Sequence, residues 1–294
     1  SYPSSLFAQF GLTVVDECHH ISSEVFSRSL LKVITPNVLG LSATMQRKDG
    51  LTKVFKMFLG PIVYSEKRGG DDKVIVKKIT FTGGNGDEEF SSTEYDYRGN
   101  PQHSRMISKL CAYGRRSDFV VGVIQKEYEE KAGQQIMVLS QNRNLLVFIH
   151  RAIEHRGFAS VGYYVGGMKE PDLKDSERKD VILATYGMAA EALDIKTLTT
   201  LVLATPRTDV TQAVGRILRV PHDRPLVVDV VDVHQVFQKQ WQKRAAFYRK
   251  NKYRIMGTTS DLYQTGRWKD DEVETDGTNR GVAPRGCLID ISTL

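Results

Sequence analysis

The sequence predicts an α/β fold, in which helices cover both faces of a parallel sheet. Short runs of β-forming residues alternate with helical segments along the chain, as at Leu12–Val15, Gln135–Ser140 and Leu226–Asp232. The first run does not alternate apolar and polar residues, which is typical of a strand buried on both faces. Several runs end in acidic or hydroxyl residues, and open α/β sheets bind ligands at the carboxyl ends of their strands.

The first expected strand, Leu12–Val15, ends in the acidic pair Asp16 and Glu17. Adjacent carboxylates at a strand end can divide two tasks in nucleotide hydrolysis. Asp16 would hold Mg²⁺, mainly through water, and Glu17 would orient or deprotonate the attacking water. For an isolated pair the plainer alternative is a surface turn, but the elements downstream favour the functional interpretation.

The next expected elements complete a first domain, residues 1–66. Val38–Leu41 predicts a second strand, closed by Ser42, Ala43 and Thr44, and Thr52–Phe58 predicts a helix. Residues 67–73, with the run Lys-Arg-Gly-Gly-Asp-Asp, have the composition of a linker or hinge.

A second domain is expected over residues 74–256, followed by a poorly ordered tail over 257–294. Residues 83–100 predict a loop or short insertion. The expected strands are Val74–Phe81, Gln135–Ser140, Val161–Val165, Asp180–Thr185, Thr200–Thr205 and Leu226–Asp232. The expected helices are Ser104–Ala112, Ser117–Lys131, the segment marked by Leu145, Phe148, Ile149 and Ile153, and Asp209–Arg219.

The segment Asp209–Arg219 places Gln212, Arg216 and Arg219 at i, i+4 and i+7, so they share one helix face. Another face can pack against the sheet through Val214, Ile217 and Leu218. Two guanidiniums on one face suit the spread negative charge of a transferring phosphoryl group. For a single arginine, a solvated basic face would be the default interpretation.

In order, these segments resemble the motifs of the superfamily 2 helicases and translocases, over roughly Leu6 to Ile255. Asp16–His19 resembles motif II, Ser42–Thr44 motif III, Ile136–Asn142 motif IV, Ala184–Asp194 motif V and Gln212–Arg219 motif VI. The chain is most similar to the XPB and UvsW branch, and within it to the viral group around the poxvirus transcript-release helicase and its African swine fever virus relative. The resemblance implies RecA-like lobes, a partial first and a complete second, that use ATP and Mg²⁺ and act on DNA or RNA.

The resemblance also implies roles for single residues. His19, Ser42 and Thr44 would couple the ATP site to strand movement, and Asp194 would face the nucleotide. Arg216 and Arg219 would be arginine fingers, with Gln212 beside them. The residues expected to contact nucleic acid are Ser140, Gly166, Gly167 and Thr185. Ala192 departs from the glycine of many relatives, which weakens the detailed assignment of motif V.

A phosphate-binding loop of the form Gly-x-x-x-x-Gly-Lys-Ser/Thr does not occur in the sequence. In this superfamily that loop lies well upstream of the acidic box, whereas 15 residues precede Asp16. We therefore expect ATP hydrolysis of the parent protein and inactivity of this chain alone. A truncated first lobe would also expose a sheet edge or face, which predicts self-association or disorder in residues 1–60.

Charge and composition agree with a nucleic-acid partner. The net charge is +6 and the pI about 9.1, which favours a polyanion. From His234 to Arg254 there are seven lysines and arginines, including Arg244. They could contact phosphates, and a solvated terminal helix is the alternative. Phe237, Trp241 and Tyr248 in the same segment recur at helical spacing, which favours a face that docks on the domain over a base-stacking platform.

The remaining expectations concern cellular context. Three widely spaced cysteines argue for a reducing compartment, and zinc binding by Cys18, His19 and His20 is disfavoured because adjacent residues point apart. We expect an intracellular protein without a membrane span, in the host cytoplasm, the viral factory and the virion if it is viral, with transcription machinery as a partner. Two alternatives stay open, a non-catalytic module that binds nucleic acid or protein and the motor subunit of a restriction or recombination system.

Overall fold

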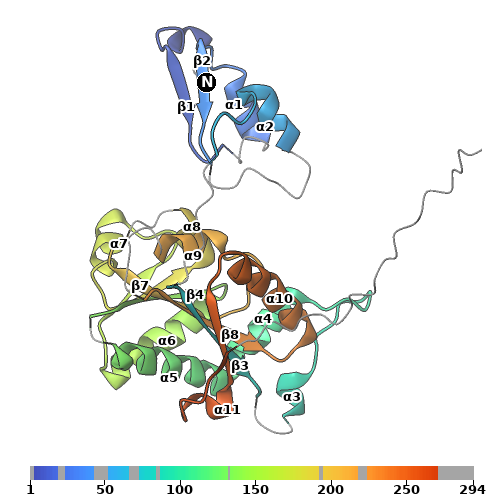
Figure 1. Cartoon of the computed structure of the whole chain (residues 1–294), viewed down its shortest axis with the longest axis vertical. Helices are drawn as coiled ribbons and strands as arrows, with labels where there is room; N and C mark the ends of the chain where they lie inside the picture. The colour runs from blue at the N-terminus through green and yellow to red at the C-terminus, as the bar shows by residue number, and fades with distance from the viewer. Residues whose placement is uncertain are drawn as a thin grey trace, which may run out of the picture. The chain divides into compact units, whose positions relative to one another are not determined.

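A computed structural model describes residues 3–18, 24–42, 52–65, 73–83, 87–131, 133–191, 195–217 and 224–270. The chain forms two compact units, unit 1 from Ser1 to Arg68 and unit 2 from Gly69 to Leu294, which are coloured from blue to red along the chain in Figure 1. Residues 67–72 of the expected linker lie outside the described residues. None of the described helices combines the length and apolar character that a bilayer crossing requires.

Unit 1 is built around a two-stranded parallel sheet. Val15 of β1 lies opposite Gly40 of β2. Gly40 leaves no room for a side chain, because an added Cβ would lie 2.4 Å from Leu59 Cδ1 and 3.1 Å from Cys18 Sγ. The elements of unit 1 are η1 Ser4–Leu6, β1 Leu12–Val15, α1 Glu24–Leu30, β2 Asn37–Gly40 and α2 Thr52–Leu59.

The expectation that the first strand is buried on both faces is wrong. Leu12 and Val14 of β1 are each 52% exposed. Their neighbour Val15 points to the opposite face, where it packs with Cys18 and with Leu59 of α2. Leu30 of α1 and Phe58 and Leu59 of α2 pack against the face of β1 that carries Val15. A continuous apolar run in the sequence therefore did not mean that helices pack on both faces of the strand.

Unit 2 contains an eight-stranded sheet in the order β10-β9-β3-β8-β7-β4-β6-β5. Every neighbouring pair is parallel except β9 and β10. The strands are β3 Ile75–Phe81, β4 Gln135–Ser140, β5 Val161–Tyr164, β6 Val181–Thr185, β7 Leu198–Leu203, β8 Leu226–Asp232, β9 Arg254–Thr259 and β10 Lys269–Asp270.

Helices cover both faces of this sheet, so the predicted fold class is confirmed. One core cluster joins the sheet to α7 Glu170–Ser176, α8 Tyr186–Glu191, α9 Thr211–Ile217 and α10 Gln235–Lys250. The other joins it to α3 Glu88–Ser91, α4 His103–Ala112, α5 Gly114–Glu130, α6 Arg143–Arg156 and α11 Ser260–Tyr263. In Figure 1, α5 and α6 run side by side on the second face. Successive strand residues alternate between the two clusters, as in Val202 and Leu203.

The docking prediction for the basic segment after His234 is confirmed. Phe237, Trp241 and Tyr248 of α10 are all buried. Phe237 joins the core on one side of the sheet and the other two join the core on the opposite side. These aromatic rings therefore hold α10 in the fold and are not available to stack on bases.

The C-terminal tail was expected to start at residue 257, and this is wrong for residues 257–270. Strand β9 pairs with β3 from Arg254 to Thr259, and Tyr263 of α11 is buried and donates to Glu127 at 2.8 Å. The small polar residues here suggested a tail, but pairing with β3 supplies the order. The loop expected at 83–100 likewise contains α3, whose Phe90 packs edge-on against Phe81 at 5.2 Å.

Candidate functional site

In unit 1 the acidic pair lies at the carboxyl end of β1, beside the end of β2. The Leu41 amide donates to the Val15 carbonyl, and the Cys18 amide donates to the Leu41 carbonyl, both at 2.9 Å. These two bonds enclose Asp16 and Glu17 in a turn next to Ser42. The acidic pair and Ser42 therefore lie at the same edge of the two-stranded sheet.

The turn itself has an unusual backbone. Glu17 adopts φ 47°, a left-handed conformation that non-glycine residues rarely hold. The Asp16 carboxylate accepts the Glu17 amide at 2.8 Å, which stabilises this conformation. Both side chains are exposed. Backbone strain of this kind is concentrated at functional sites.

The Asp16 carboxylate fits Mg²⁺, which prefers oxygen ligands and keeps several of its waters. Among the described residues no cluster of three or more His, Cys, Asp or Glu side chains forms a metal site. Burial raises the pKa of the Cys18 thiol, which disfavours the thiolate that zinc requires. His19 and His20 lie outside the described residues.

In unit 2 the residues expected to contact nucleic acid meet at one edge of the sheet. Ser140 lies opposite Thr185 in the register of β4 and β6, and β5, which leads to Gly166 and Gly167, pairs with β6 on its other side. Gly167 has φ +91°, which a side chain would disfavour. Arg143 donates to the Gly166 carbonyl at 2.9 Å and so ties this turn to the start of α6.

The structure distinguishes among these residues. Ser140 is fully buried, and its hydroxyl bonds both the amide and the carbonyl of Asn142 at 2.9 Å. Asn142 in turn caps α6 by accepting the Leu145 amide. The expected direct contact between Ser140 and nucleic acid disagrees with this burial, so Ser140 shapes the turn. Thr185 is half-buried and Gly167 is exposed.

The remaining predicted residues are only partly described. Gln212 is half-buried on α9, and Val214 packs in the core as expected. Arg216 belongs to the same helix, although its side chain lies outside the description. His19, Thr44, Asp194 and Arg219 also lie outside the described residues. Their assigned roles stay predictions.

Comparison with known proteins finds similar viral proteins. It is 35% identical over 260 residues to a protein of Acanthamoeba polyphaga mimivirus, covering 87% of this chain and 50% of the relative. It is 26% identical over 296 residues to a protein of African swine fever virus, covering 89% of this chain and 55% of the relative. Both are named "Putative ATP-dependent RNA helicase". The chain thus spans about half the length of these relatives.

Solved structures agree at the level of the fold. UvsW of phage T4 matches with a TM-score of 0.50 and 18% identity, over 88% of this chain and 56% of that chain. Dbp5 of S. cerevisiae, bound to RNA and ADP BeF3, matches with a TM-score of 0.55 and 13% identity, over 88% and 62%. The chain therefore resembles viral helicases in sequence and superfamily 2 helicases in fold. No protein-family model matches it.

Among its described residues, unit 2 contains two buried ion pairs that sequence reasoning missed. Arg116 of α5 binds both carboxylate oxygens of Asp232 at 2.6 and 2.9 Å, and Arg244 of α10 binds both oxygens of Asp229 at 2.7 and 2.8 Å. Burial alone would lower the pKa of each arginine, but the facing carboxylate holds it above its ordinary value. The expected phosphate contact of Arg244 is therefore wrong. The sequence feature that could have indicated these ion pairs is the pair of aspartates within the valine-rich strand β8, because a carboxylate in a buried strand needs a partner.

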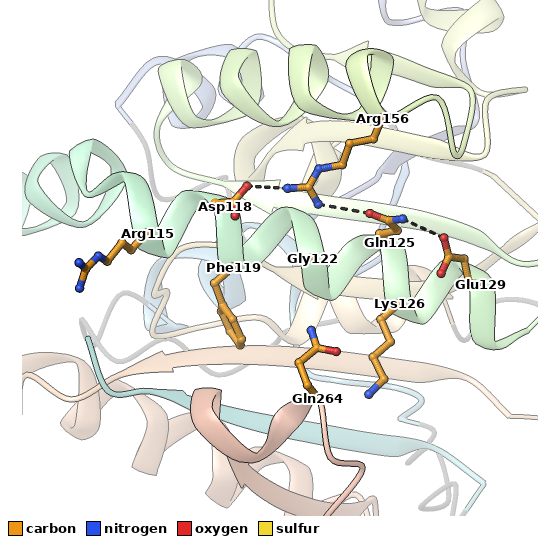
Figure 2. A pocket seen from close by; sticks show the side chains of 9 residues that line it. All are labelled: Arg115, Asp118, Phe119, Gly122, Gln125, Lys126, Glu129, Arg156 and Gln264. Carbon is orange, nitrogen blue, oxygen red and sulfur yellow. Dashed lines mark hydrogen bonds and ion pairs between the residues drawn. The ribbon is translucent and has the colours of Figure 1, made fainter. Parts of the chain in front are cut away.

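A hollow in unit 2 lies against α5, α6 and Gln264 (Figure 2). Two of the three cations that line it, Arg156 and Lys126, already bind other groups of the chain. Arg156 donates to Asp118 at 2.5 Å and to Gln125 at 3.2 Å, and Lys126 donates to the Tyr263 carbonyl at 3.0 Å. None of the predicted site residues lines it.

Proposed function

We propose that the protein containing this chain couples ATP hydrolysis to movement along a nucleic-acid strand. The observation that carries the proposal is the Asp16–Glu17 turn, strained at Glu17 and bonded to the neighbouring strand end beside Ser42. Two acids at a strand end suit magnesium binding and water activation. The similarity to viral proteins named as ATP-dependent helicases supports the same conclusion.

Each step of ATP hydrolysis would depend on different residues of the site. Bound Mg²⁺ would neutralise phosphate charge when held by Asp16. Glu17 would position the attacking water and take up its proton. Arg216 and Arg219 would stabilise the charge on the transferring phosphoryl group, with Gln212 beside them, and His19, Ser42, Thr44 and Asp194 would respond to the nucleotide.

On the nucleic-acid side, Thr185 and the Gly166–Gly167 turn would hold backbone phosphates. Backbone amides and hydroxyls bind phosphate without regard to base sequence, which suits a motor that steps along a strand. We further propose a role in viral transcription, such as transcript release, or in genome processing, within the host cell; the viral origin of the similar proteins supports the viral context alone.

The test is nucleic-acid-stimulated ATP hydrolysis by the complete coding sequence. Glu17→Gln should lower turnover by roughly 10²- to 10⁴-fold while leaving binding of a fluorescent ATP analogue intact, and Glu89→Gln, an exposed glutamate on α3, is the matched control. The assay uses single- and double-stranded DNA and RNA, so the best activator identifies the track. Retained turnover in Glu17→Gln would overturn the assignment. An inactive wild-type protein that still binds nucleic acid would favour a binding module.

A further inference from the structure

The loop after β7, residues 204–207, is held by an uncommon set of hydrogen bonds. Four consecutive backbone carbonyls each accept a side-chain donor from a different segment of unit 2. The donors, in order from Ala204 to Arg207, are Arg116 of α5 at 3.0 Å, Tyr186 of α8 at 2.6 Å, Gln141 after β4, and Arg244 of α10. Gln141 also donates its amide to the Thr205 hydroxyl at 2.9 Å.

Two of these donors belong to the buried ion pairs. Buried ion pairs contribute little net stability, because the cost of removing the charges from water offsets their attraction. Their clear effect here is geometric. Arg116 binds Asp232 through Nε and Nη2, and the same Nη2 also donates to the Ala204 carbonyl. Arg244 binds Asp229 through Nε and Nη2, and its third nitrogen, Nη1, donates to the Arg207 carbonyl. The loop is therefore anchored from both faces of the sheet.

The anchored loop presents one exposed cation, Arg207. Its guanidinium carbon lies 5.5 Å from the centre of the Tyr186 ring. Tyr186 is 6% exposed and its hydroxyl is engaged with the Thr205 carbonyl, so the ring is a fixed support. In the part of the chain that the structure describes, this guanidinium contacts an aromatic ring rather than a carboxylate.

The position of Arg207 links it to the predicted site. Tyr186 directly follows Thr185, and the parallel strands β7 and β6 both pair with β4, so their carboxyl ends share one edge of the sheet. Helices α8 and α9, which flank the loop, lie beside each other in Figure 1. A planar guanidinium stacked on a ring keeps its N–H edges free for bidentate bonds to an oxyanion.

We propose that Arg207 binds a phosphate oxyanion at this edge, positioned by the carbonyl-anchored loop and by the ring of Tyr186. This inference rests on the proposed function and adds a binding residue to it. The oxyanion has two possible sources, a backbone phosphate of the nucleic-acid strand or a phosphate of the nucleotide, and the experiment has one arm for each.

The experiment measures binding by the 294-residue chain. In the first arm, the anisotropy of labelled single-stranded DNA and RNA oligonucleotides is followed from low to moderate salt. Arg207→Gln should weaken binding roughly tenfold and reduce the slope of log affinity against log salt by about 0.7, the value for one phosphate on a single strand. Arg207→Lys should keep the slope, because the charge remains, and lose affinity.

The second arm measures binding of a fluorescent ATP analogue. The matched control in both arms is Arg178→Gln, because Arg178 is exposed but precedes the amino end of β6, at the opposite edge of the sheet. Tryptophan fluorescence checks folding, since both tryptophans lie in unit 2.

Each outcome decides the question. A loss confined to the oligonucleotide arm assigns Arg207 to the strand, and a loss confined to the nucleotide arm assigns it to the nucleotide. If the wild-type chain binds a ligand and Arg207→Gln behaves like Arg178→Gln in both arms, the role of Arg207 is refuted while the proposed function stands. If the wild-type chain binds neither ligand, the inference is refuted for this chain, while the ATPase assay on the complete coding sequence decides the proposed function separately.

Discussion

Removing Arg116 should destabilise unit 2 more than removing its ion pair as a whole. Arg116 and Asp232 are both fully buried and joined by two short bonds. Arg116→Met leaves the Asp232 carboxylate buried without its cation, and breaking a buried pair in this way costs about 3 to 5 kcal/mol. It also removes the donor to the Ala204 carbonyl.

The double variant Arg116→Met with Asp232→Leu should recover most of this loss. Replacing both charges by apolar groups of similar volume is often close to neutral, and the unpaired Ala204 carbonyl then leaves a residual cost of about 1 to 3 kcal/mol. The single and double variants should therefore differ clearly in free energy of unfolding. The recovery would come from removing the buried carboxylate, because the arginine is absent from both.

Urea denaturation followed by tryptophan fluorescence measures this difference. Trp241 and Trp268 are the two tryptophans of the chain and both lie in unit 2, so the signal reports that unit. With a slope of roughly 3 kcal/mol per M, the Arg116→Met midpoint should fall by roughly 1 to 1.7 M. A loss below about 1 kcal/mol, or a double variant less stable than the single one, would refute the reasoning.

Two further predictions use the same titration. Gly83 and Gly99 have nearly equal φ values of +78° and +77°, but a Cβ at Gly83 would lie 2.3 Å from the Phe90 ring while one at Gly99 meets nothing within 4 Å. Gly99→Ala should cost about 1 to 2 kcal/mol from backbone strain alone, and Gly83→Ala about 1 to 3 kcal/mol more from the clash; equal losses would contradict the packing argument. Burial lowers the pKa of His234, so below about pH 6.5 the unfolded chain takes up a proton that the folded chain does not. Stability should then fall by up to about 1.4 kcal/mol per pH unit towards the folded pKa, and the gap between wild type and His234→Gln should narrow from pH 7.5 to pH 5.5; a constant gap would be evidence against this linkage.

Much of the fold followed from local patterns. Strands such as Gln135–Ser140 and Leu226–Asp232 match β4 and β8 residue for residue, because buried parallel strands need continuous apolar runs. Strand β9 was missed, since its short segment Arg254–Thr259 acquires its order from pairing with β3. The predicted burial of both faces of β1 was wrong, because burial of a strand depends on which helices and strands pack against it in the folded chain.

For the candidate site too, some features could be predicted from local sequence and others could not. Asp16 and Glu17 could be found from the sequence because the acids directly follow a strand-forming run, and the spacing of Gln212 and Arg216 directly defines a helix face. Ser140 and Thr185 look alike as hydroxyls at strand ends, yet one is fully buried and the other half-buried. Neighbouring residues do not encode that difference.

The sequence by itself determined the order of the motifs, the α/β class and the chemistry at each strand end, because each depends on residues close together in the chain. Only the tertiary structure decided which of these groups are accessible and what holds them. Arg116 and Asp232 lie 116 residues apart, and the loop that presents Arg207 is anchored by four separate segments. Burial and charge pairing arise from contacts between distant segments, so they are decided only when the chain has folded.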